Sequence, residues 1–523
     1  MNHNAELAGA ALAHLAGLGV KHIMVCAGAR NAPIVTSLLA SEERIGWRIW
    51  HHFDERSASF FALGLAKKLG EPVTVVTTSG TAVAELLPAT IEAYYSGIPL
   101  VLVSADRPAA YRGSGAPQAI EQVGIFGPYA PVAIDARDVT DLSWLLKWNR
   151  DEPVHLNLCF EEPSPDDTAT EWEAIDLPHP RIPSEHNDEL SVEAFVANPK
   201  GLVVLLGELE AGWRLPVESF LAALGVPVWA EATSGLRESG KLAAQMIREE
   251  RRVADLHPRE ILRIGGVPSL RFWRDLENLE EIAVMSVTRR PFSGLARLSR
   301  LLVTNEFPRW SEGFSPSRKL CSLTIEEGLK ASLQPPLEAF PASEPAMMRA
   351  VSELIPEDAL VYLGNSLPIR EWNLAATLTP GHPRCFASRG ANGIDGQIAT
   401  FLGLSETEEE SWGIFGDLTA LYDLNAPALL AQLPKGQRRF VVMNNGGGKI
   451  FSRLPSLSGL DEKAKGVTEN HHAQEFKSWA EMWGLTHIEW KAGEAAPVLN
   501  GDNLLIEVVL DNEASESFWS EWK

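Results

Sequence analysis

Residues 412–418 read WGIFGDL, and residues 440–448 read FVVMNNGGG. Each stretch is a short apolar run followed by polar and glycine residues: Asp417 follows the first run, and Asn444 and Asn445 follow the second. Continuous apolar runs of this length are typical of strands buried in a parallel sheet. The spacing from Asp417 to Asn444 is that of one strand–helix–strand step. Both polar loops are therefore predicted at the same edge of one sheet.

These residues form a set of hard oxygen ligands at that edge. A carboxylate from Asp417, an amide oxygen from Asn444 and the carbonyl of Gly446 suit Mg²⁺, with Mn²⁺ as an alternative, when a diphosphate and water complete the coordination. Either loop alone is an ordinary turn, but the pair at this spacing predicts a metal–diphosphate site. The chain has neither a glycine-rich dinucleotide fingerprint nor a P-loop, which disfavours nicotinamide and P-loop chemistry.

The rest of the chain also alternates strand and helix, which predicts an α/β protein of three doubly wound parallel-sheet domains. Two proline-rich stretches, 161–183 and 334–345, are interpreted as linkers. They divide the chain into domains 1–183, 184–335 and 336–523. Helices are predicted over 57–69 and 81–95, and the predicted strands are 22–26, 47–50, 72–77, 99–104, 202–206, 226–230, 260–264, 282–287, 301–304, 360–363, 412–415, 440–443 and 504–509.

Composition and charge narrow the classes of partner. The chain has 523 residues and a net charge of −23, so its overall field disfavours nucleic acid and anionic membranes. Its apolar runs are too short for membrane insertion, and its first residues predict an amphipathic helix rather than a signal peptide. Cys26, Cys159, Cys321 and Cys385 form no paired motif, which favours a cytoplasmic protein without a disulfide framework. Anionic partners would have to be bound by local arginines or by a metal.

The two polar loops resemble the GDG…NN fingerprint of thiamine-diphosphate enzymes, with Leu418 in place of the last glycine. Such enzymes need a carboxylate that hydrogen-bonds N1′ of the coenzyme's pyrimidine ring, while the coenzyme supplies the difficult chemistry. Glu55 fits because it follows the predicted strand 47–50 and opens a helix capped by Asp54. Phe53 and the buried helix are expected to desolvate Glu55 and raise its pKa. The alternative is that Glu55 only complements the helix dipole.

Two further positions need an interpretation. A bulky aliphatic side chain must bend the coenzyme so that its amino group reaches C2, and Ile394 in the run 393–396 is the candidate; the alternative is an ordinary core residue. The histidine pairs at 51–52 and 471–472 lack metal-ligand spacing, so structural or surface roles are favoured for them.

The chain resembles the 2-succinyl-5-enolpyruvyl-6-hydroxy-3-cyclohexene-1-carboxylate synthase family of menaquinone biosynthesis over nearly its whole length. The resemblance rests on runs much more specific than the coenzyme fingerprint. They are CAGAR at 26–30, HFDER at 52–56, TTSGTA at 77–82, SADRP at 104–108, QAI at 118–120, GNSL at 364–367, SRGANGIDG at 388–396 and GDLTALYDLN at 416–425.

The resemblance implies a transferase that decarboxylates 2-oxoglutarate and adds the resulting four-carbon acyl carbanion to isochorismate in a 1,4-addition. Both substrates are dicarboxylates, which planar guanidinium groups bind better than lysine does. The implied substrate-binding residues are Arg30, Arg107, Gln118, Arg271, Ser366, Arg370 and Arg389. The implied coenzyme-binding residues are Glu55, Thr78, Asn392, Ile394, Gly416, Asp417, Leu418, Asn444, Gly446 and Gly447, with Glu55 catalytic and with Asp417, Asn444 and Gly446 as metal ligands.

The resemblance also implies a homodimer, or a homotetramer, because the coenzyme of the superfamily lies between domains of two subunits. Ala29, Pro117 and Leu270 depart from the family, which usually has Ser, Asn and Lys there, and each departure removes a polar contact near the substrates. Two alternatives remain open. One is an acetolactate-synthase-like decarboxylase or carboligase, which the arginine set disfavours. The other is a non-catalytic binding protein of the same fold, which Glu55, Asp417 and Asn444 disfavour.

Overall fold

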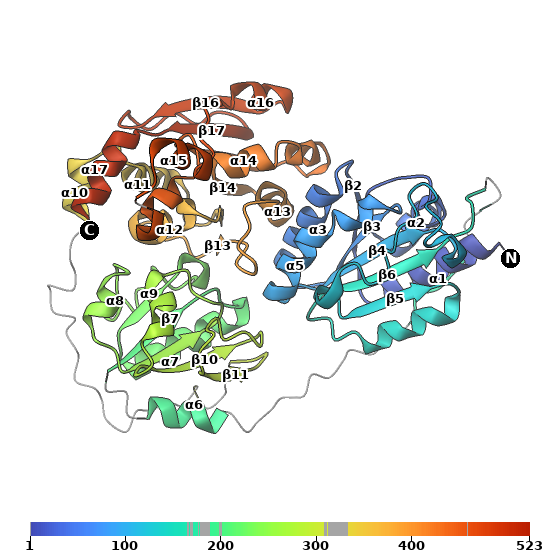
Figure 1. The fold of residues 1–523 in the computed structure, drawn as a ribbon, viewed down its shortest axis with the longest axis horizontal. Helices are drawn as coiled ribbons and strands as arrows, with labels where there is room; N and C mark the ends of the chain where they lie inside the picture. Colours follow the sequence, from blue (N-terminus) through green and yellow to red (C-terminus); the bar gives the residue numbers. More distant parts are fainter. Residues whose placement is uncertain are drawn as a thin grey trace. The chain divides into compact units, whose positions relative to one another are not determined.

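The computed structural model describes residues 2–164, 167, 171–175, 177, 189–197, 201–307, 311, 333–457 and 459–522 (Figure 1). Within these described residues three separate sheets form, with six, five and six strands. All strand pairs within them are parallel. The predicted fold class is therefore confirmed. The chain divides into two compact units: the first is Met1–Ile182, Gly390–Thr407 and Thr419–Lys435, and the second is Pro183–Arg389, Glu408–Leu418 and Gly436–Lys523.

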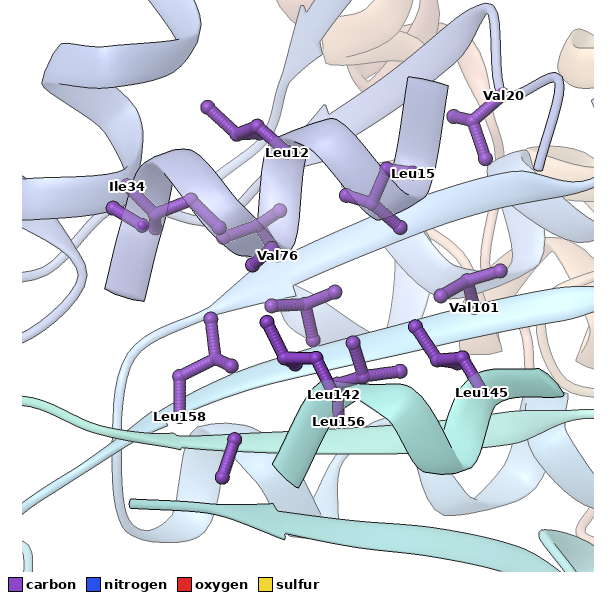
Figure 2. Packing of buried hydrophobic residues seen from close by; sticks show 14 of the residues in the cluster. Leu12, Leu15, Val20, Ile34, Val76, Val101, Leu142, Leu145, Leu156 and Leu158 are labelled. Carbon is purple, nitrogen blue, oxygen red and sulfur yellow. The ribbon is translucent and has the colours of Figure 1, made fainter. Parts of the chain in front are cut away.

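The first sheet has the strand order β2-β1-β3-β4-β6-β5. Its strands are β1 (His22–Val25), β2 (Arg48–His51), β3 (Val73–Thr77), β4 (Leu100–Asp106), β5 (Val132–Ala136) and β6 (Val154–Cys159). Buried side chains of α1 (His3–Gly17), α2 (Ala32–Ile45) and the 3₁₀ segment η3 (Val139–Lys147) pack on one face of it (Figure 2). The helices α3 (Glu55–Leu69) and α5 (Leu87–Ser96) pack against each other, and α3 also contacts β1, β3 and β4.

Local signals explain where these helices begin. The Asp54 carboxylate accepts a hydrogen bond from the Ser57 amide (3.1 Å) at the start of α3, as the predicted cap requires. The single helix predicted over 81–95 is wrong, because α4 (Thr81–Ala84) ends before α5 begins. Pro88 lies in the first turn of α5. Proline is tolerated there because the amides of the first turn have no partner inside the helix.

The second sheet has the order β11-β10-β9-β7-β8. Its strands are β7 (Leu202–Leu206), β8 (Val228–Ala230), β9 (Glu260–Ile264), β10 (Ala283–Thr288) and β11 (Arg300–Val303). The helices along this part of the chain are α6 (Glu189–Val196), α7 (Arg214–Leu224), α8 (Arg252–Asp255) and α9 (Arg271–Asp275).

The third sheet, β13-β12-β14-β15-β17-β16, repeats the strand order of the first. Its strands are β12 (Leu360–Leu363), β13 (Cys385–Phe386), β14 (Glu410–Gly416), β15 (Gln437–Asn444), β16 (Thr486–Lys491) and β17 (Asn503–Val509). The helices are α10 (Gln334–Ala339), α11 (Glu344–Leu354), α12 (Leu367–Ala375), α13 (Gln397–Leu404), α14 (Asp417–Tyr422), α15 (Glu462–Thr468), α16 (Lys477–Met482) and α17 (Asn512–Glu521).

The second predicted linker, 334–345, is wrong over most of its length. Its residues form α10 and the start of α11, again with prolines in the first turns. Most of the first linker and Cys321 lie outside the described residues. The other three cysteines are free and buried. The domain boundaries after 183 and after 335 stay predictions.

One close helix contact holds α13 in the first unit. A Cβ atom on Gly64 of α3 would lie 2.1 Å from the Thr400 carbonyl oxygen, and one on Gly403 of α13 would lie 2.2 Å from the Phe61 carbonyl oxygen. Glycine at both positions lets the two backbones approach. The loop 390–396, which carries Asn392 and Ile394, is thereby connected to the α3 helix that begins with Glu55.

Candidate active site

Asp417 lies where β14 ends and α14 begins, and four backbone amides surround its carboxylate. Oδ2 accepts hydrogen bonds from Gly446 (2.8 Å), Gly447 (3.0 Å) and Asn445 (3.2 Å), and Oδ1 accepts one from Leu418 (2.6 Å). Burial raises the pKa of this carboxyl, while the amides and His472 oppose the rise. Because Oδ2 is saturated with donors, the free coordination capacity of Asp417 is on Oδ1.

The Asn444 side chain at the end of β15 has a defined orientation. Its Nδ2 donates to Glu507 Oε1 (2.8 Å) and to the Gln474 carbonyl (3.0 Å), which uses both amide hydrogens. Among the described residues, its Oδ1 accepts only a long bond from the Gly446 amide (3.3 Å). The carbonyl of Gly446 accepts from the His472 amide (3.1 Å) and keeps one lone pair. An amide oxygen and a carbonyl oxygen thus remain free to bind a cation.

The glycines of this loop are required by its backbone. Gly446 has φ 78° and Gly447 has φ 148°, and a Cβ atom on Gly447 would lie 2.6 Å from the Glu469 carbonyl oxygen. These features fit Mg²⁺ or Mn²⁺ held through Asp417, Asn444 and Gly446. In the described part of the chain there is no cluster of three His, Cys, Asp or Glu side chains that could hold a metal alone, so any metal at this loop would need neutral oxygens or a bound diphosphate as well.

Two residues next to this site were not predicted from the sequence. His472, for which a structural or surface role was favoured, has its Nε2 3.3 Å from Asp417 Oδ2. Glu507 is 2% exposed and contacts Asn444 directly. A signal for Glu507 was present, since it interrupts the apolar run 504–509 of a buried strand, and buried charges of this kind are rare unless they are paired.

Glu55 is the first residue of α3 in the first unit. Its pKa is raised, first by burial and then by the negative charges of Asp54 and Glu85. The expected contribution of Phe53 is wrong within this chain: its ring is 68% exposed and stacks on His52.

Thr78 follows β3 and is buried. Its Oγ1 has no hydrogen-bond partner among the described residues. A Cβ atom on Gly28, which follows β1, would lie 2.6 Å from the Thr78 side chain, so only glycine fits beside it. An orphaned buried hydroxyl at the carboxyl edge of the sheet fits a site that receives a polar ligand.

Two buried carboxylates hold the loop 390–396. The Glu92 oxygens of α5 accept from the amides of Gly390 (2.7 Å) and Ala391 (2.6 Å). The Asp423 oxygens accept from Gly396 and Ile398, both at 2.9 Å, and burial raises the pKa of Asp423 to about 6. Between these anchors, Asn392 has φ 61° and is exposed, and Ile394 is half-buried.

Two of the predicted substrate-binding arginines meet at one carboxylate. Arg30 follows β1 and is buried, and its Nη2 lies 2.6 Å from Glu162 Oε2. Arg107 follows β4, and its Nη1 lies 3.6 Å from the same oxygen. The guanidinium groups, that of Arg30 first, lower the pKa of Glu162. Gln118 has φ 56° and packs against Gly80, two residues after Thr78.

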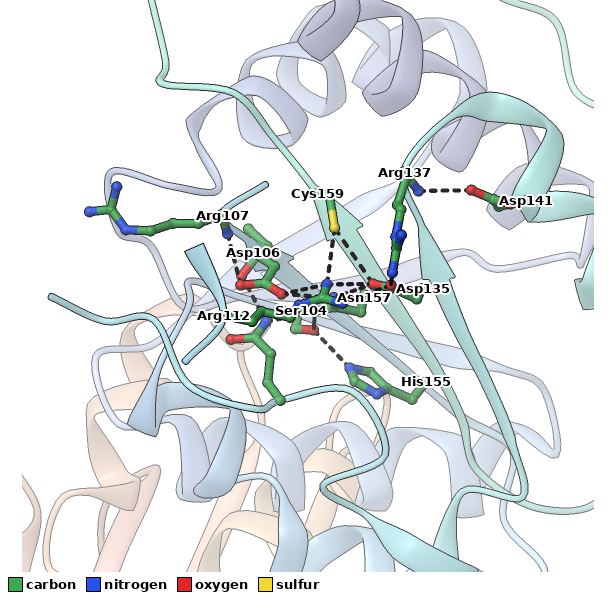
Figure 3. Close-up of polar contacts among 12 residues, drawn as sticks. Ser104, Asp106, Arg107, Arg112, Asp135, Arg137, Asp141, His155, Asn157 and Cys159 are labelled. Carbon is green, nitrogen blue, oxygen red and sulfur yellow. Dashed lines mark hydrogen bonds and ion pairs between the residues drawn. The ribbon is translucent and has the colours of Figure 1, made fainter. Parts of the chain in front are cut away.

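A buried network of hydrogen bonds connects the segment 107–122 to the first sheet (Figure 3). Asp106 accepts from the Arg107 amide (2.8 Å), from Arg112 Nη2 (3.0 Å) and from Asn157 Nδ2 (3.0 Å). Asn157 in turn accepts from Gln122 (2.6 Å), which closes the far end of the same segment. The segment 107–122, which carries Arg107 and Gln118, is therefore anchored at both ends.

The other predicted substrate-binding residues lie in the second unit. Arg389 Nη1 donates to Asn365 Oδ1 (2.9 Å), and its buried Nε has no partner among the described residues. Arg370 Nη1 donates to the Ser269 carbonyl (3.1 Å). Desolvation lowers its pKa, as do the charges of Arg389 and Arg274. Arg271, whose amide contacts Glu250, is largely exposed.

Ser366, the last of the predicted substrate-binding residues, and Leu270, a departure from the family, also lie in the second unit. Ser366 has φ 74° and precedes α12. Leu270, one of the family departures, is buried in an apolar cluster with Phe272 and Trp273. A lysine at this position could not keep that packing without burying its charge.

Comparison with known proteins agrees with this geometry. A family profile described as "Thiamine pyrophosphate enzyme, N-terminal TPP binding domain" matches residues 6–125. The chain is 41% identical to a 2-succinyl-5-enolpyruvyl-6-hydroxy-3-cyclohexene-1-carboxylate synthase of Akkermansia muciniphila, with 99% of this chain and 98% of that protein covered. It is 40% identical, with the same coverage, to a protein of that name from Bdellovibrio bacteriovorus.

Among solved structures, an X-ray structure from Mycobacterium smegmatis, described as thiamin diphosphate-dependent, has a TM-score of 0.69. It covers 96% of this chain and 98% of its own, at 16% identity. At that identity the similarity shows the fold alone.

Proposed function

The chain belongs to the 2-succinyl-5-enolpyruvyl-6-hydroxy-3-cyclohexene-1-carboxylate synthase family, and on that basis we propose that it decarboxylates 2-oxoglutarate and adds the remaining four-carbon acyl unit to isochorismate. The products are CO₂ and the compound that names the family, an intermediate of menaquinone biosynthesis. The observation that carries the proposal is the similarity to two synthases of this name over 99% of the chain.

Thiamine diphosphate is the coenzyme, and its thiazolium ring supplies the stabilisation of negative charge at the carbon that was the keto group. In our proposal Asp417 Oδ1, Asn444 Oδ1 and the Gly446 carbonyl hold Mg²⁺, or Mn²⁺, at the diphosphate. Gly416, Leu418 and Gly447 form the surrounding backbone. The saturated Oδ2 of Asp417 keeps its carboxylate from rotating, because three amides hold it. The metal site is thereby preorganised.

In the proposal Glu55 holds a proton at N1′ of the pyrimidine ring. Its raised pKa supports this role, because a carboxyl that is easier to protonate shares a proton more readily with a ring nitrogen. Thr78 and Asn392 offer polar contacts to the coenzyme, and Ile394 offers an apolar one. The anchoring of the Ile394 loop by Glu92 and Asp423 supports a fixed position for that side chain.

The proposed substrate carboxylates are bound by guanidinium groups in both units. Arg30 and Arg107, with Gln118 beside them, already hold a carboxylate, that of Glu162. The buried Nε–H of Arg389 has no acceptor in the described part of the chain, and Arg370, Arg271 and Ser366 add further donors. Ala29, Pro117 and Leu270 offer no polar side chain, so affinity rests more heavily on the arginines.

We propose further that the enzyme acts as a homodimer or homotetramer in the cytoplasm. Exposed apolar side chains close to Glu55 in the first unit support self-association: Phe53, Tyr422 and Leu424 are all exposed, and Arg56 of α3 stacks on Tyr422. Within the described residues, no helix is both long enough and apolar enough to span a membrane. Light scattering of the purified protein, with Phe53→Glu as the variant expected to dissociate, tests the assembly.

The reaction is tested by incubating the protein with thiamine diphosphate, Mg²⁺, 2-oxoglutarate and isochorismate. We expect CO₂ release and a product whose mass equals that of isochorismate plus 2-oxoglutarate less CO₂. Replacing 2-oxoglutarate by pyruvate tests the acetolactate-synthase-like alternative. Product formation from pyruvate but not from 2-oxoglutarate would overturn the substrate assignment, and no turnover of any 2-oxo acid by coenzyme-loaded protein would overturn the enzymatic one.

A further inference from the structure

We propose that Glu507 is a positioning residue that fixes the Asn444 amide with its oxygen toward the metal. The inference deepens the proposed function and rests on it, since Asn444 is a metal ligand only within that proposal. Glu507 is remote in sequence from both polar loops, and none of the sequence motifs includes it.

An asparagine side chain presents either an oxygen or an NH₂ group to a cation, and only the oxygen can bind it. The two orientations differ by a half-turn of the amide, so a neighbouring group must select one. Glu507 is the side chain that does so, because its Oε1 accepts from Asn444 Nδ2 at 2.8 Å and a carboxylate cannot donate in return. The Gln474 backbone carbonyl favours the same orientation through a longer bond of 3.0 Å. Rotation of the amide would bring two oxygens together and would lose this bond.

Glu507 itself is held in place. Its Oε2 accepts from the Phe476 amide (3.0 Å) and lies 2.9 Å from His487 Nε2. It is 2% exposed, so its carboxylate has little freedom to turn toward water. A buried charge with these partners on both oxygens is a rigid support, as groups that orient metal ligands are.

The segment 472–476 ties the same loop from the other side. The His472 amide donates to the Gly446 carbonyl (3.1 Å), and the Gln474 carbonyl accepts the second hydrogen of Asn444 Nδ2 (3.0 Å). The Phe476 amide then reaches Glu507. Asn444, Gly446 and Glu507 are thus connected through one short segment, and Glu507 is the side chain that sets the direction of the Asn444 oxygen.

The test is Glu507→Gln. A glutamine can satisfy the Phe476 amide with its oxygen, but it then points its own NH₂ at Asn444, which favours the rotated amide with nitrogen toward the metal. We expect the Mg²⁺ concentration for half-maximal thiamine diphosphate binding, followed by calorimetry, to rise about 10–100-fold. At saturating Mg²⁺, coenzyme affinity should return close to that of the parent protein, which general loss of structure would not allow.

The matched control is Glu489→Gln, the same change at the residue that pairs with Glu507 in register on β16. Glu489 is half-exposed and pairs with Lys491, so its Mg²⁺ requirement should stay within twofold of the parent. If Glu507→Gln does not fold, Glu507→Asp is used instead, because it keeps the buried charge but withdraws the oxygen from Asn444. The same increase is expected.

Asp417→Ala separates this inference from the proposed function. If Asp417→Ala loses coenzyme binding while the Glu507 variants keep the parent Mg²⁺ requirement, the inference is wrong and the metal site stands. If Asp417→Ala binds coenzyme as tightly as the parent protein, the metal site itself is wrong. An equal increase in Glu489→Gln and Glu507→Gln would also overturn the inference, since it would assign the effect to charge alone.

Discussion

The first and third sheets have the same strand order. At the carboxyl ends of their strands, each sheet has an amide–carboxylate pair, and the two pairs are arranged in opposite ways. β4 of the first sheet ends at Asp106, and β15 of the third ends at Asn444. On the next strand of each sheet, Asn157 and Glu507 occupy equivalent registers: each pairs with the residue two positions before that strand end, Ser104 and Val442 respectively. In both sheets an amide donates to a carboxylate between these two positions, at 3.0 and 2.8 Å.

The two residue types are exchanged between the sheets. In the first sheet the carboxylate, that of Asp106, is at the strand end. It accepts hydrogen bonds from Arg107, Arg112 and Asn157. In the third sheet the carboxylate is on the neighbouring strand, and the amide at the strand end keeps its oxygen free. In the first sheet this pair therefore acts as an internal brace, whereas in the third sheet the equivalent pair leaves an amide oxygen that can bind a ligand. The difference is that a carboxylate, Asp106, ends β4, whereas an amide, Asn444, ends β15.

Removing the carboxylate of the ligand-binding edge should have the largest effect. Asp417→Ala should abolish Mg²⁺-dependent thiamine diphosphate binding in calorimetry, because the amides of residues 445–447 lose the acceptor that organises them. The control is Asp358→Ala, an exposed aspartate at the opposite end of the third sheet, before β12. Unchanged affinity in Asp417→Ala with Mg²⁺ present would mean that the third sheet has no ligand-binding edge.

The second prediction concerns the proton-handling group of the first sheet. Glu55→Gln keeps the shape of the side chain but cannot share a proton with N1′, so C2–H/D exchange of bound coenzyme should slow by about 10²–10⁴-fold. Coenzyme affinity should survive, because the metal ligands belong to the third sheet. NMR of bound coenzyme measures the exchange.

Glu85→Gln is the matched control, since Glu85 is exposed and acts on Glu55 only through its charge. Its removal should make the pKa of Glu55 less elevated and change the exchange rate little. Exchange in Glu55→Gln as fast as in the parent protein would remove Glu55 from the activation step.

Much of the fold and the positions of the metal-binding loops could be predicted from the sequence. The strands β7, β9 and β12 were predicted with the bounds that the structure has, and so was the Asp54 cap, because apolar runs and capping residues are local signals. The positions of Asp417 and Asn444 at neighbouring strand ends followed from strand–helix–strand spacing. The spacing did not predict which side chains contact Asp417 and Asn444.

The exchanged pairs themselves could not be predicted. β6 was missed because His155 and Asn157 interrupt its apolar run. Their burial is explained by partners that are distant in the sequence, such as Ser104 for His155 (2.7 Å) and Gln122 for Asn157 (2.6 Å). The contact between Arg30 and Glu162 joins residues that are far apart in the chain. No local rule connects such residues, because their proximity depends on how the whole sheet is assembled.

The third prediction tests whether arginines at both edges bind the substrates. Arg107→Ala and Arg389→Ala should each lose about 2–5 kcal/mol of productive binding, because a desolvated carboxylate of the substrate would lose its charged guanidinium partner. Steady-state kinetics with each substrate varied measures the loss. Arg137→Ala is the control, because the exposed guanidinium of Arg137 forms an ion pair only with Asp135 among the described carboxylates. A change below twofold in both variants would place the substrate pocket elsewhere.

The fourth prediction tests the brace. Asn157→Leu should destabilise the protein by about 1–3 kcal/mol, because Asp106 and Gln122 would keep buried polar atoms without this partner. The Mg²⁺ requirement should not change, in contrast to Glu507→Gln. Thermal unfolding and the Mg²⁺ titration measure the two effects, with exposed Asn149→Leu as the control. An altered Mg²⁺ requirement in Asn157→Leu would show that the Asp106–Asn157 and Asn444–Glu507 pairs do not have separate roles.

The smallest expected effect is at Glu162, whose carboxylate contacts both Arg30 and Arg107. If these arginines bind a substrate carboxylate, Glu162 competes with it, and Glu162→Gln should lower the KM of one substrate about two- to fivefold with little change in kcat. The effect is small because Glu162 is 78% exposed, and water screens ion pairs of this kind. Glu161→Gln is the matched control, since Arg30 contacts only its backbone carbonyl. A KM that rises in Glu162→Gln would mean that Glu162 orients the arginines for the substrate and does not compete with it.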